Sequence, residues 1–569
     1  MTDSLSTPDP GTEPSVHDPT AVDRLARSAG EASDRARAIS GALAVRLAMV
    51  RMRILPRAAL AGRMQPDADD ADDWSFLRRP ALMGFFALVA VVVGASLPSS
   101  PFKLEMPGTW YFGEPAEAGV ASTSFLLFGL VAVYGGLVLL MRVWCGMIRA
   151  LGRRPGVPIR YMWVILALWT LPMLVVAPIF SRDVFSYAAQ GEMMSHHINP
   201  YVYGPGTLGA GPYVAPVDQL WMNTPAPYGP LFLIVDGFFA SASLHHELVT
   251  VIFLRLLAVA GVALIAWCIP RLAAAYGRDA GPVFTLAVLN PLVILTLIGA
   301  GHNDSIMIGL LLAGLVAAKN RHPVWGVVLC TLAAAIKAPA AVGVIYIGWD
   351  WLGVGIPWRQ RVRPLVTAGI VATAVMALLT VVSGLGWGWV GNLATPGTVR
   401  SWLAPATGIG MAASGLAHTV GLNVSAPGVL SVTRLIGLLG AAVAAVWLLL
   451  ESDRIGSLKA MGLTLLLFVV MGPVVQPWYL TWGIILLAPV ASRRLRAVLI
   501  GISVISPFIG LPGGRTLLDE LIHSNPLSVA GALVVCVGVL VFPLGRWASS
   551  WRDDDADEWL AQPLPVVEA

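Results

Sequence analysis

Long hydrophobic runs alternate with short polar segments over most of the chain, from Pro80 to Gly545. Many of these runs approach 20 residues, the length of helix that crosses about 30 Å of hydrocarbon. The run boundaries predict spans at 81–99, 122–148, 160–180, 248–275, 282–300, 303–319, 323–337, 339–353, 364–384, 428–450, 458–473, 477–491, 496–510 and 527–545. The pattern therefore predicts an all-α polytopic membrane protein with about 13–15 transmembrane helices.

Composition supports this class. Of the 569 residues, 56% are hydrophobic and 12% are charged, and the mean hydropathy is +0.74. Soluble domains carry about 25% charged residues, so a soluble enzyme with a single anchor is excluded. The four cysteines lie in apolar runs without CxxC spacing, which indicates core thiols and neither metal ligands nor disulfides.

The ends of the chain differ from its middle. Residues 1–79 are predicted to form a cytoplasmic region that is partly disordered, first basic and then acidic. Residues 80–546 are expected to form the catalytic transmembrane domain. The acidic residues 547–569 are expected to be a cytoplasmic tail.

The placement of Lys and Arg predicts the topology, because cytoplasmic loops carry an excess of both. We assign six basic clusters to the cytoplasm: Arg149/Arg153/Arg154, Lys319/Arg321, Arg359/Arg361/Arg363, Arg454/Lys459, Arg493/Arg494/Arg496 and Arg546/Arg552. The segment 181–247 holds a single cation, Arg182, and is expected to be a large extracytoplasmic loop. Within it, Leu231 to Leu244 is predicted to be a re-entrant or interfacial helix, because a further crossing would place the later clusters outside.

The stretch from Ile179 to Pro230 is the strongest candidate for a site. It follows the end of an apolar run and contains five tyrosines and an adjacent Arg182-Asp183 pair. Asp183 is our candidate general base, because a span end would determine its depth and transfer to a hydroxyl requires one base within hydrogen-bond reach. The alternative is that Asp183 only pairs with Arg182 or caps the next helix. Glu192, Asp218 and Asp304 are the reserve candidates for the base.

Cations are scarce on the predicted outer face, and charge at membrane depth is usually paired or functional. Lys337, Arg400 and Arg515 are expected to include ligands of a phosphate group, with Arg255 and Arg434 next in line. The chain shows no glycine-rich phosphate loop and no nucleotide-binding pattern. A donor reaching this face would therefore be carried by the membrane, and a polyprenyl phosphate sugar fits.

Several motifs in order carry a family resemblance: SRDVFSYAAQG and INPY, then APYGP, GHNDS, IKAP and QPWYLTW. Together they resemble the actinobacterial polyprenol-phosphomannose-dependent α-(1→6)-mannosyltransferases, the MptA/MptB group of the GT-C glycosyltransferase superfamily. The resemblance covers roughly residues 80–545. It implies a GT-C-like bundle whose large extracytoplasmic loop carries interfacial helices, and it maps the acidic position of the family onto Asp183.

The resemblance further implies inverting transfer of mannose from β-linked polyprenyl phosphate mannose to a mannosylated glycolipid. The product would be the mannan of lipomannan and lipoarabinomannan, outside the plasma membrane.

Many GT-C members have a paired acidic motif where this chain has Arg182-Asp183, so we expect no metal and no cofactor. Membrane lipids are expected partners and nucleic acid is not. The residues expected to bind substrate are Arg182, Tyr187, Asn199, Tyr201, Tyr228, His302, Asp304, Lys337, Arg400, Gln476, Trp478, Tyr479 and Arg515.

Two alternatives stay open. An arabinosyl- or protein O-mannosyltransferase would use the same kind of lipid donor. A lipid-linked sugar transporter would also be polytopic, but transporters often show internal repeats with broken helices at corresponding positions. We find no convincing repeat, and the polar residues gather on one predicted face instead of at the midplane.

Overall fold

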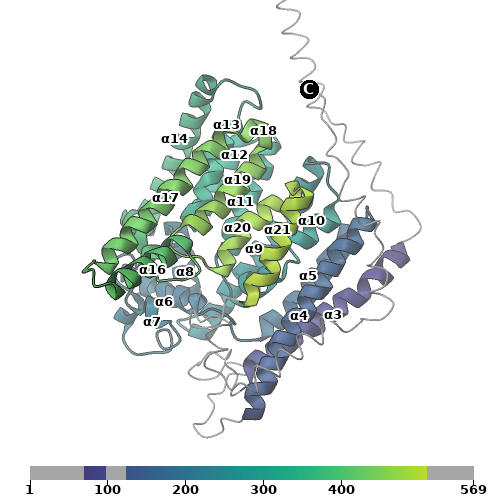
Figure 1. Cartoon of the computed structure of the whole chain (residues 1–569), viewed down its shortest axis with the longest axis horizontal. Helices are drawn as coiled ribbons and strands as arrows, with labels where there is room; N and C mark the ends of the chain where they lie inside the picture. The colour runs from purple at the N-terminus through teal and green to yellow at the C-terminus, as the bar shows by residue number, and fades with distance from the viewer. Residues whose placement is uncertain (1–69, 98–122, 509–569) are drawn as a thin grey trace, which may run out of the picture. The chain divides into compact units, whose positions relative to one another are not determined.

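The computed structural model of the chain describes residues 70–97 and 123–508 (Figure 1). Within these ranges every regular element is a helix, and no β-strand is present. Most of the N-terminal region, the predicted span 527–545, Arg515 and the acidic tail lie outside the described residues.

Five helices in the described ranges are long and apolar enough to cross a membrane by themselves. They are α3 (Asp70–Ser96), α4 (Thr123–Arg153), α9 (Glu247–Ala275), α14 (Trp358–Ser383) and α17 (Ala426–Leu450). A sixth crossing would combine the π-helix η2 (Val293–Gly299) with α11 (Asp304–Lys319), which are bent by 110° at a short break. The chain is thus a multi-pass helical membrane protein, as the hydrophobic pattern predicts.

The other apolar runs form shorter helices: α5 (Ile159–Val175), α10 (Ala280–Ala287), α12 (Pro323–Ala334), α13 (Val342–Asp350), α19 (Ser457–Met471), α20 (Leu480–Leu487) and α21 (Arg493–Ile505). Even α5, with 17 residues, rises only about 26 Å, less than the roughly 30 Å of hydrocarbon. The run 282–300 is interrupted at Asn290-Pro291, because proline disfavours helical geometry in the residue before it. The number of 13–15 spans therefore stays a prediction.

The segment 181–247 is largely helical. It contains α6 (Asp183–Ser195), η1 (Pro205–Leu208), α7 (Gln219–Met222) and α8 (Pro230–Ala242). The 13 residues of α8 rise about 20 Å, so its length agrees with a helix that does not cross the bilayer. Helices α6 and α8 pack closely at Gly191, where a Cβ would lie 2.3 Å from the carbonyl oxygen of Asp236. This packing anchors the helix that begins with Asp183.

The segment between α14 and α17 also contains helices: α15 (Gly388–Gly391), η4 (Asn392–Thr398) and α16 (Pro405–Thr419). Arg434 on α17 holds the end of η4 in place. Its guanidinium donates to Thr407 Oγ1 at 2.9 Å, to the carbonyl of Val399 at 2.6 Å and to the carbonyl of Gly397. Because these bonds engage all three of its nitrogens, Arg434 has a structural role here.

Arg255 is likewise engaged with the backbone. It is 2% exposed within α9, and it donates to the carbonyls of Met173, of Val176 at 2.5 Å and of Gly299 at 3.3 Å. These carbonyls lie at the ends of α5 and η2, where helices leave acceptors without intrahelical partners. Arg255 therefore ties two helix ends together, next to the segment that leads into α6.

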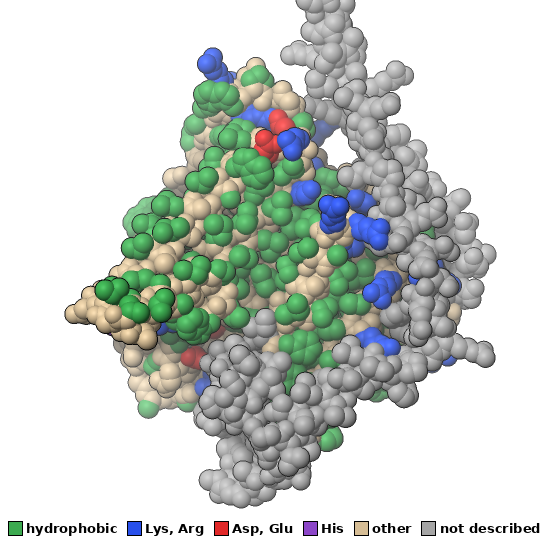
Figure 2. All heavy atoms as spheres, viewed as in Figure 1, with side chains coloured by type: hydrophobic (Ala, Val, Ile, Leu, Met, Phe, Trp, Pro, Cys, Tyr) green, Lys and Arg blue, Asp and Glu red, His purple; other side chains and the backbone are tan. Residues whose placement is uncertain are grey.

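Helices α14 and α17 expose rows of large hydrophobic side chains, among them Ile370, Val381, Val443 and Val446. Such surfaces suit contact with lipid tails, not water. Figure 2 shows hydrophobic side chains over the broad middle of the viewed face, and most of the visible Lys and Arg side chains towards its upper and right borders. This separation of charge from apolar surface agrees with a bundle embedded in a bilayer.

In the predicted cytoplasmic cluster Arg359/Arg361/Arg363, the Arg361 side chain is held in place by ion pairs. Arg361 is 1% exposed, and its guanidinium contacts Asp453 Oδ2 at 2.6 Å and donates to the carbonyl of Trp349 at 2.8 Å. Asp453 lies in α18 (Ser452–Ile455). In Figure 1, α18 and α13 lie at the opposite end of the helices from α6, α7 and α8. The turn that contains Arg361 and Asp453 and the segment that contains Asp183 therefore lie at opposite ends of the helices.

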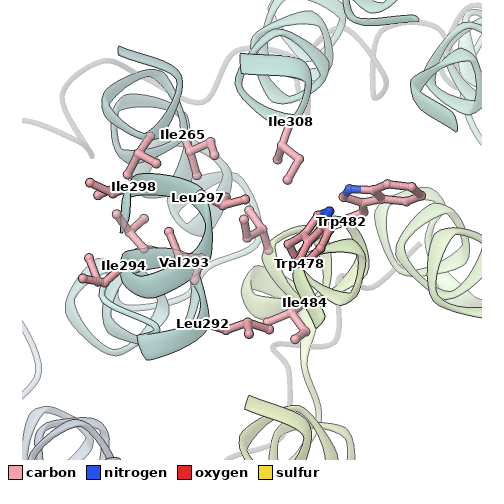
Figure 3. Close-up of a cluster of buried hydrophobic side chains, with 14 of the residues drawn as sticks. Ile265, Leu292, Val293, Ile294, Leu297, Ile298, Ile308, Trp478, Trp482 and Ile484 are labelled. Atoms are coloured by element: carbon pink, nitrogen blue, oxygen red, sulfur yellow. The ribbon is translucent and has the colours of Figure 1, made fainter. Parts of the chain in front are cut away.

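The remaining short elements are single turns: η3 (Ala338–Ala341), η5 (Pro477–Tyr479), η6 (Ala488–Val490) and η7 (Ser506–Phe508). The turn η5 and the helix α20 that follows it connect the core to the candidate site. Trp478 of η5 and Trp482 of α20 lie beside Leu297 of η2 and Ile308 of α11 in a buried apolar cluster (Figure 3). This core holds the QPWYLTW motif against the GHNDS turn.

Candidate active site

Asp183 is the first residue of α6, and its side chain is 15% exposed. Its backbone N–H donates to Ser181 Oγ at 3.2 Å, and Trp221 Nε1 donates to its Oδ1 at 3.1 Å. Burial raises the pKa of Asp183 to about 6, although Lys337 and the Trp221 hydrogen bond act in the opposite direction. No ion pair joins Asp183 to Arg182 within the described residues. A carboxylate with this pKa is a proton acceptor at neutral pH.

The GHNDS turn brings a histidine to Asp183. Gly301 has φ +75°, and a Cβ there would lie 3.1 Å from Arg255 Cγ and 3.3 Å from Val184 Cγ2. Glycine thus permits both the left-handed turn and close contact with the first turn of α6. As a result His302 Nδ1 lies 3.8 Å from Asp183 Oδ2, and the imidazole stacks on Trp478 with 4.0 Å between ring centroids.

Asp304 and Lys337 form a buried ion pair beside this turn. Lys337 Nζ lies 2.8 Å from Asp304 Oδ2, and Trp482 Nε1 donates to Asp304 Oδ1 at 2.6 Å. Lys337 Nζ also lies 4.6 Å from the ring centroid of Tyr479 and 5.9 Å from that of Tyr228. The ammonium group is therefore surrounded by one carboxylate and by aromatic faces, which favour cations.

The APYGP motif is bound to the IKAP turn through the backbone. Gly229 N–H donates to the carbonyl of Ile336 at 3.1 Å, and Leu231 N–H donates to that of Ala335 at 3.0 Å. A Cβ at Gly229 would lie 2.3 Å from the carbonyl oxygen of Ala335. Glycine is needed for this close approach, which brings Tyr228 to Lys337.

Tyr187 and Tyr201 contact Tyr228, and Asn199 contacts Tyr201. Tyr187 is 1% exposed and packs edge-on against Tyr228 with 5.1 Å between centroids. The hydroxyl of Tyr201 donates to the carbonyl of Tyr228 at 3.0 Å. Asn199 Nδ2 donates to the carbonyl of Leu385 at 3.2 Å, and its Oδ1 accepts from Tyr201 N–H at 2.9 Å. These contacts support the position of Tyr228.

The structure does not bring every expected residue to Asp183. Arg182 is half-buried beside it, and Gln476 is half-buried directly before η5. Arg400 is exposed in the segment after η4, and no contact joins its side chain to the Asp183 cluster within the described residues. Arg515 lies outside these residues. Of the three expected phosphate ligands, the structure thus places Lys337 in the site.

Several buried polar atoms in the motifs around Asp183 have no hydrogen-bond partner in the described part of the chain. They include Ser186 Oγ, both ring nitrogens of His302, the side-chain amide of Asn303 and Trp478 Nε1, and further atoms of this kind lie in other elements. Leaving such groups unpaired costs free energy, so clusters of them point to a function. The arrangement is suited to a polyhydroxylated ligand that would supply the missing donors and acceptors.

Comparison with known proteins identifies the family. The model for the α-(1→6)-mannopyranosyltransferase N-terminal domain matches residues 81–353, and the model for the MptB C-terminal domain matches residues 406–541. The chain is 32% identical to α-(1→6)-mannopyranosyltransferase A of Mycobacterium tuberculosis over 467 residues, which is 78% of this chain and 86% of that protein. The chain belongs to the α-(1→6)-mannopyranosyltransferase family.

Two further relatives agree with this assignment. A probable α-(1→6)-mannopyranosyltransferase of Mycolicibacterium smegmatis is 32% identical over 512 residues, covering 82% of this chain and 89% of the relative. α-(1→6)-Mannopyranosyltransferase B of Corynebacterium glutamicum is 30% identical over 373 residues, covering 61% and 62%. No solved structure matches the chain. The resemblance to the MptA/MptB group inferred from the motifs is confirmed.

In this mannopyranosyltransferase the reserve carboxylates all have other partners. Asp218 caps α7, with its Oδ1 accepting from Leu220 N–H at 2.9 Å. Asp304 pairs with Lys337, and Glu192 contacts His196 and His245. Of the four carboxylates, Asp183 therefore remains the best candidate for the base. It forms no ion pair with Lys or Arg in the described chain, and the unpaired imidazole of His302 lies beside it.

Sequence analysis omitted two residues of the candidate site, Trp221 and Trp482. Both donate indole N–H groups to carboxylates, Trp221 to Asp183 and Trp482 to Asp304. Trp482 lies in the QPWYLTW motif, and Trp221 lies in the short helix α7 between α6 and α8. Tryptophans near a membrane surface are commonly belt residues, so their indole hydrogen bonds could be assigned only from the structure.

Gly229→Ala is expected to destabilise the mannopyranosyltransferase by about 1–3 kcal/mol, because overpacking against a backbone carbonyl forces a local shift. Donor KM should rise as well, since the shift separates Tyr228 from Lys337. The apparent Tm and the KM for the sugar donor measure the two effects. Gly211→Ala in the same loop is the matched control, because a Cβ there meets nothing within 4 Å. Equal Tm values for both variants would contradict the close approach at Gly229.

Proposed function

We propose that this chain transfers mannose from polyprenyl phosphate mannose to a mannosylated glycolipid, forming α-(1→6) links of the lipomannan and lipoarabinomannan core. The reaction would occur at the outer face of the plasma membrane, in a GT-C-like arrangement with the loop 181–247 outside. Family membership supports the mannosyl transfer. The observation that carries the chemistry is the partly exposed Asp183 carboxylate at the start of α6, whose pKa burial raises to about 6.

In the proposed reaction the 6-hydroxyl oxygen of the acceptor attacks C1 of the donor mannose. The bond between C1 and the phosphate oxygen breaks, and the polyprenyl phosphate leaves with the electron pair. Asp183 accepts the hydroxyl proton, so a β-linked donor gives an α-linked product with inversion and without a covalent enzyme intermediate. A single base is sufficient for this displacement.

The remaining residues have roles that follow from their contacts. His302 lies 3.8 Å from Asp183 and has no hydrogen-bond partner in the described chain, so it is proposed to bind the acceptor or donor mannose. Lys337 is proposed to contact the donor phosphate with the N–H donors that Asp304 does not use. Tyr228, Trp478 and Tyr479 supply aromatic surface to the same region. Arg182, Arg400, Gln476 and Arg515 remain proposed substrate contacts.

The decisive assay uses purified protein, synthetic polyprenyl phosphate mannose and short α-(1→6)-mannoside acceptors. We expect α-(1→6)-linked products from this donor. Products from polyprenyl phosphate arabinose or a peptide acceptor in place of the mannoside would favour the arabinosyl- or protein O-mannosyltransferase alternatives. Movement of the lipid-linked sugar across a vesicle membrane without glycoside formation would favour the transporter.

The pH dependence of transfer should reveal the base. Asp183 must be deprotonated to accept a proton, and its pKa is raised to about 6. kcat/KM should therefore be near its maximum above pH 7 and fall as the pH decreases through about 6, approaching a tenfold loss for each unit below it. An acid limb with its midpoint near 4 would contradict the buried environment of Asp183.

Impermeant maleimide labelling in intact cells tests the membrane orientation. Ala215 is exposed in the segment between η1 and α7, and Arg494 is exposed at the start of α21. In a cysteine-free background, Ala215→Cys should be labelled and Arg494→Cys should be protected until the membrane is permeabilised. Arg361, although predicted to be cytoplasmic, is unsuitable because it is buried. The reverse labelling pattern would invert the proposed topology.

A further inference from the structure

A second cluster of ionisable side chains lies at the other end of α6 from Asp183. Glu192 is in the last turn of this helix, His196 follows its end, and His245 follows α8. Glu192 Oε1 lies 3.0 Å from His196 Nε2, and Glu192 Oε2 lies 2.9 Å from His245 Nδ1. One ligand atom from each residue lies within 4.8 Å of the other two.

We propose that Glu192, His196 and His245 bind one Zn²⁺ ion. Two imidazole nitrogens and one carboxylate oxygen form a common zinc donor set, with ligand distances of about 2.0–2.2 Å. The two imidazole nitrogens lie against the two oxygens of one carboxylate, at 3.0 and 2.9 Å, so the three side chains converge on one point. Small side-chain adjustments would complete the site.

The backbone before and at His245 supports a dedicated role. Leu244 has φ +54° and His245 has φ +60°. Two consecutive non-glycine residues in the left-handed region are unfavourable, and such conformations cluster at functional sites. Leu244 is 87% exposed. Leu244 N–H donates to the carbonyl of Ser241 at 3.0 Å and His245 N–H donates to that of Ala240 at 3.1 Å, so the turn caps the end of α8. The cap also places His245 beside Glu192 of the neighbouring helix.

The burial of the three side chains suits a metal site with an open position. Glu192 is 10% exposed, whereas His196 and His245 are 56% and 49% exposed. Solvent could therefore complete the coordination. Glu192 lies about 13 Å along α6 from Asp183, so the ion would not take part in the transfer step. It would instead join the end of α6 to the connection between α8 and α9.

The test uses the full-length protein with any polyhistidine tag removed. Metal-free protein is titrated with Zn²⁺ in competition with a chromophoric chelator. We expect one high-affinity zinc per wild-type chain, and a loss of more than about tenfold in affinity for Glu192→Gln and His245→Asn. Asn is chosen at His245 because it tolerates the left-handed backbone. His246→Ala, an exposed neighbouring histidine outside the cluster, should bind zinc as the wild type does.

Thermal unfolding supplies a second readout that does not depend on activity. Zinc that binds only the folded state should raise the apparent Tm of the wild type and of His246→Ala by several degrees, and it should not raise that of His245→Asn. The proposal is overturned if the wild type binds no zinc at micromolar concentration, or if zinc stabilises all variants equally. A loss of affinity in His246→Ala that matches the loss in His245→Asn would also overturn it.

Discussion

Asp183→Asn is expected to lower mannose transfer by about 10²–10⁴-fold while the protein remains folded. Asn has the same size as Asp and can still accept the hydrogen bond from Trp221 Nε1, so packing around α6 should be retained. It cannot accept the proton of the acceptor hydroxyl. The measurement is kcat per folded molecule, together with apparent Tm and the binding of the lipid donor.

Two further variants separate the base from a merely structural carboxylate. Asp183→Glu should also be severely slowed, because an additional methylene displaces the oxygen from the transfer geometry. Asp218→Asn is the matched control in the same loop, since Asn and Asp cap helices about equally well. Near-normal turnover by well-folded Asp183→Asn protein would remove Asp183 from the mechanism.

Lys337→Met is expected to produce the second large effect, on stability and on donor binding together. It leaves the fully buried Asp304 without its cation, and breaking a buried ion pair in this way typically costs about 3–5 kcal/mol. If Lys337 also contacts the donor phosphate, the substitution removes a charge-assisted hydrogen bond worth about 1.5–3 kcal/mol. This corresponds to roughly 10- to 150-fold in donor affinity. Apparent Tm and the dissociation constant for the donor measure the two effects.

The double variant Lys337→Met/Asp304→Asn distinguishes these contributions. Neutralising both partners removes the unpaired buried charge, so much of the lost stability should return, while donor affinity should stay low. Arg400→Gln provides the comparison with an exposed cation, and its stability should be close to that of the wild type. Wild-type donor affinity in the double variant would show that the phosphate is held elsewhere and would direct attention to Arg400 and Arg515.

The helical membrane class was predictable, and Asp183 could be proposed as the base, because both inferences depend on local sequence. A run of about 20 apolar residues needs no distant partner to indicate a membrane helix. The adjacency of Asp183 to the end of such a run, within the SRDVFSYAAQG motif, is also local information. The family resemblance followed from several short motifs in a given order, and the comparisons confirmed it.

Other predictions depended on how helices end and pack. The spans 160–180 and 282–300 were drawn from hydrophobicity, whereas α5 ends at Val175 and the second run breaks at Asn290-Pro291. Arg255 was considered as a phosphate ligand because outer cations are scarce. Its guanidinium is instead engaged by backbone carbonyls at two helix ends. The hydrophobic pattern does not show which Arg or Lys side chains donate hydrogen bonds to the free carbonyls at helix ends.

By itself the sequence determined the membrane class, the family and the loop in which the chemistry was expected. These conclusions rest on hydrophobic length, the distribution of charge and the order of motifs, all of which can be read along one chain. Only the tertiary structure decided that His302 reaches Asp183, that Lys337 pairs with Asp304 and that His245 reaches Glu192. These contacts join residues 33 to 119 positions apart, and they form because glycine turns and helix packing bring distant segments within a few ångströms.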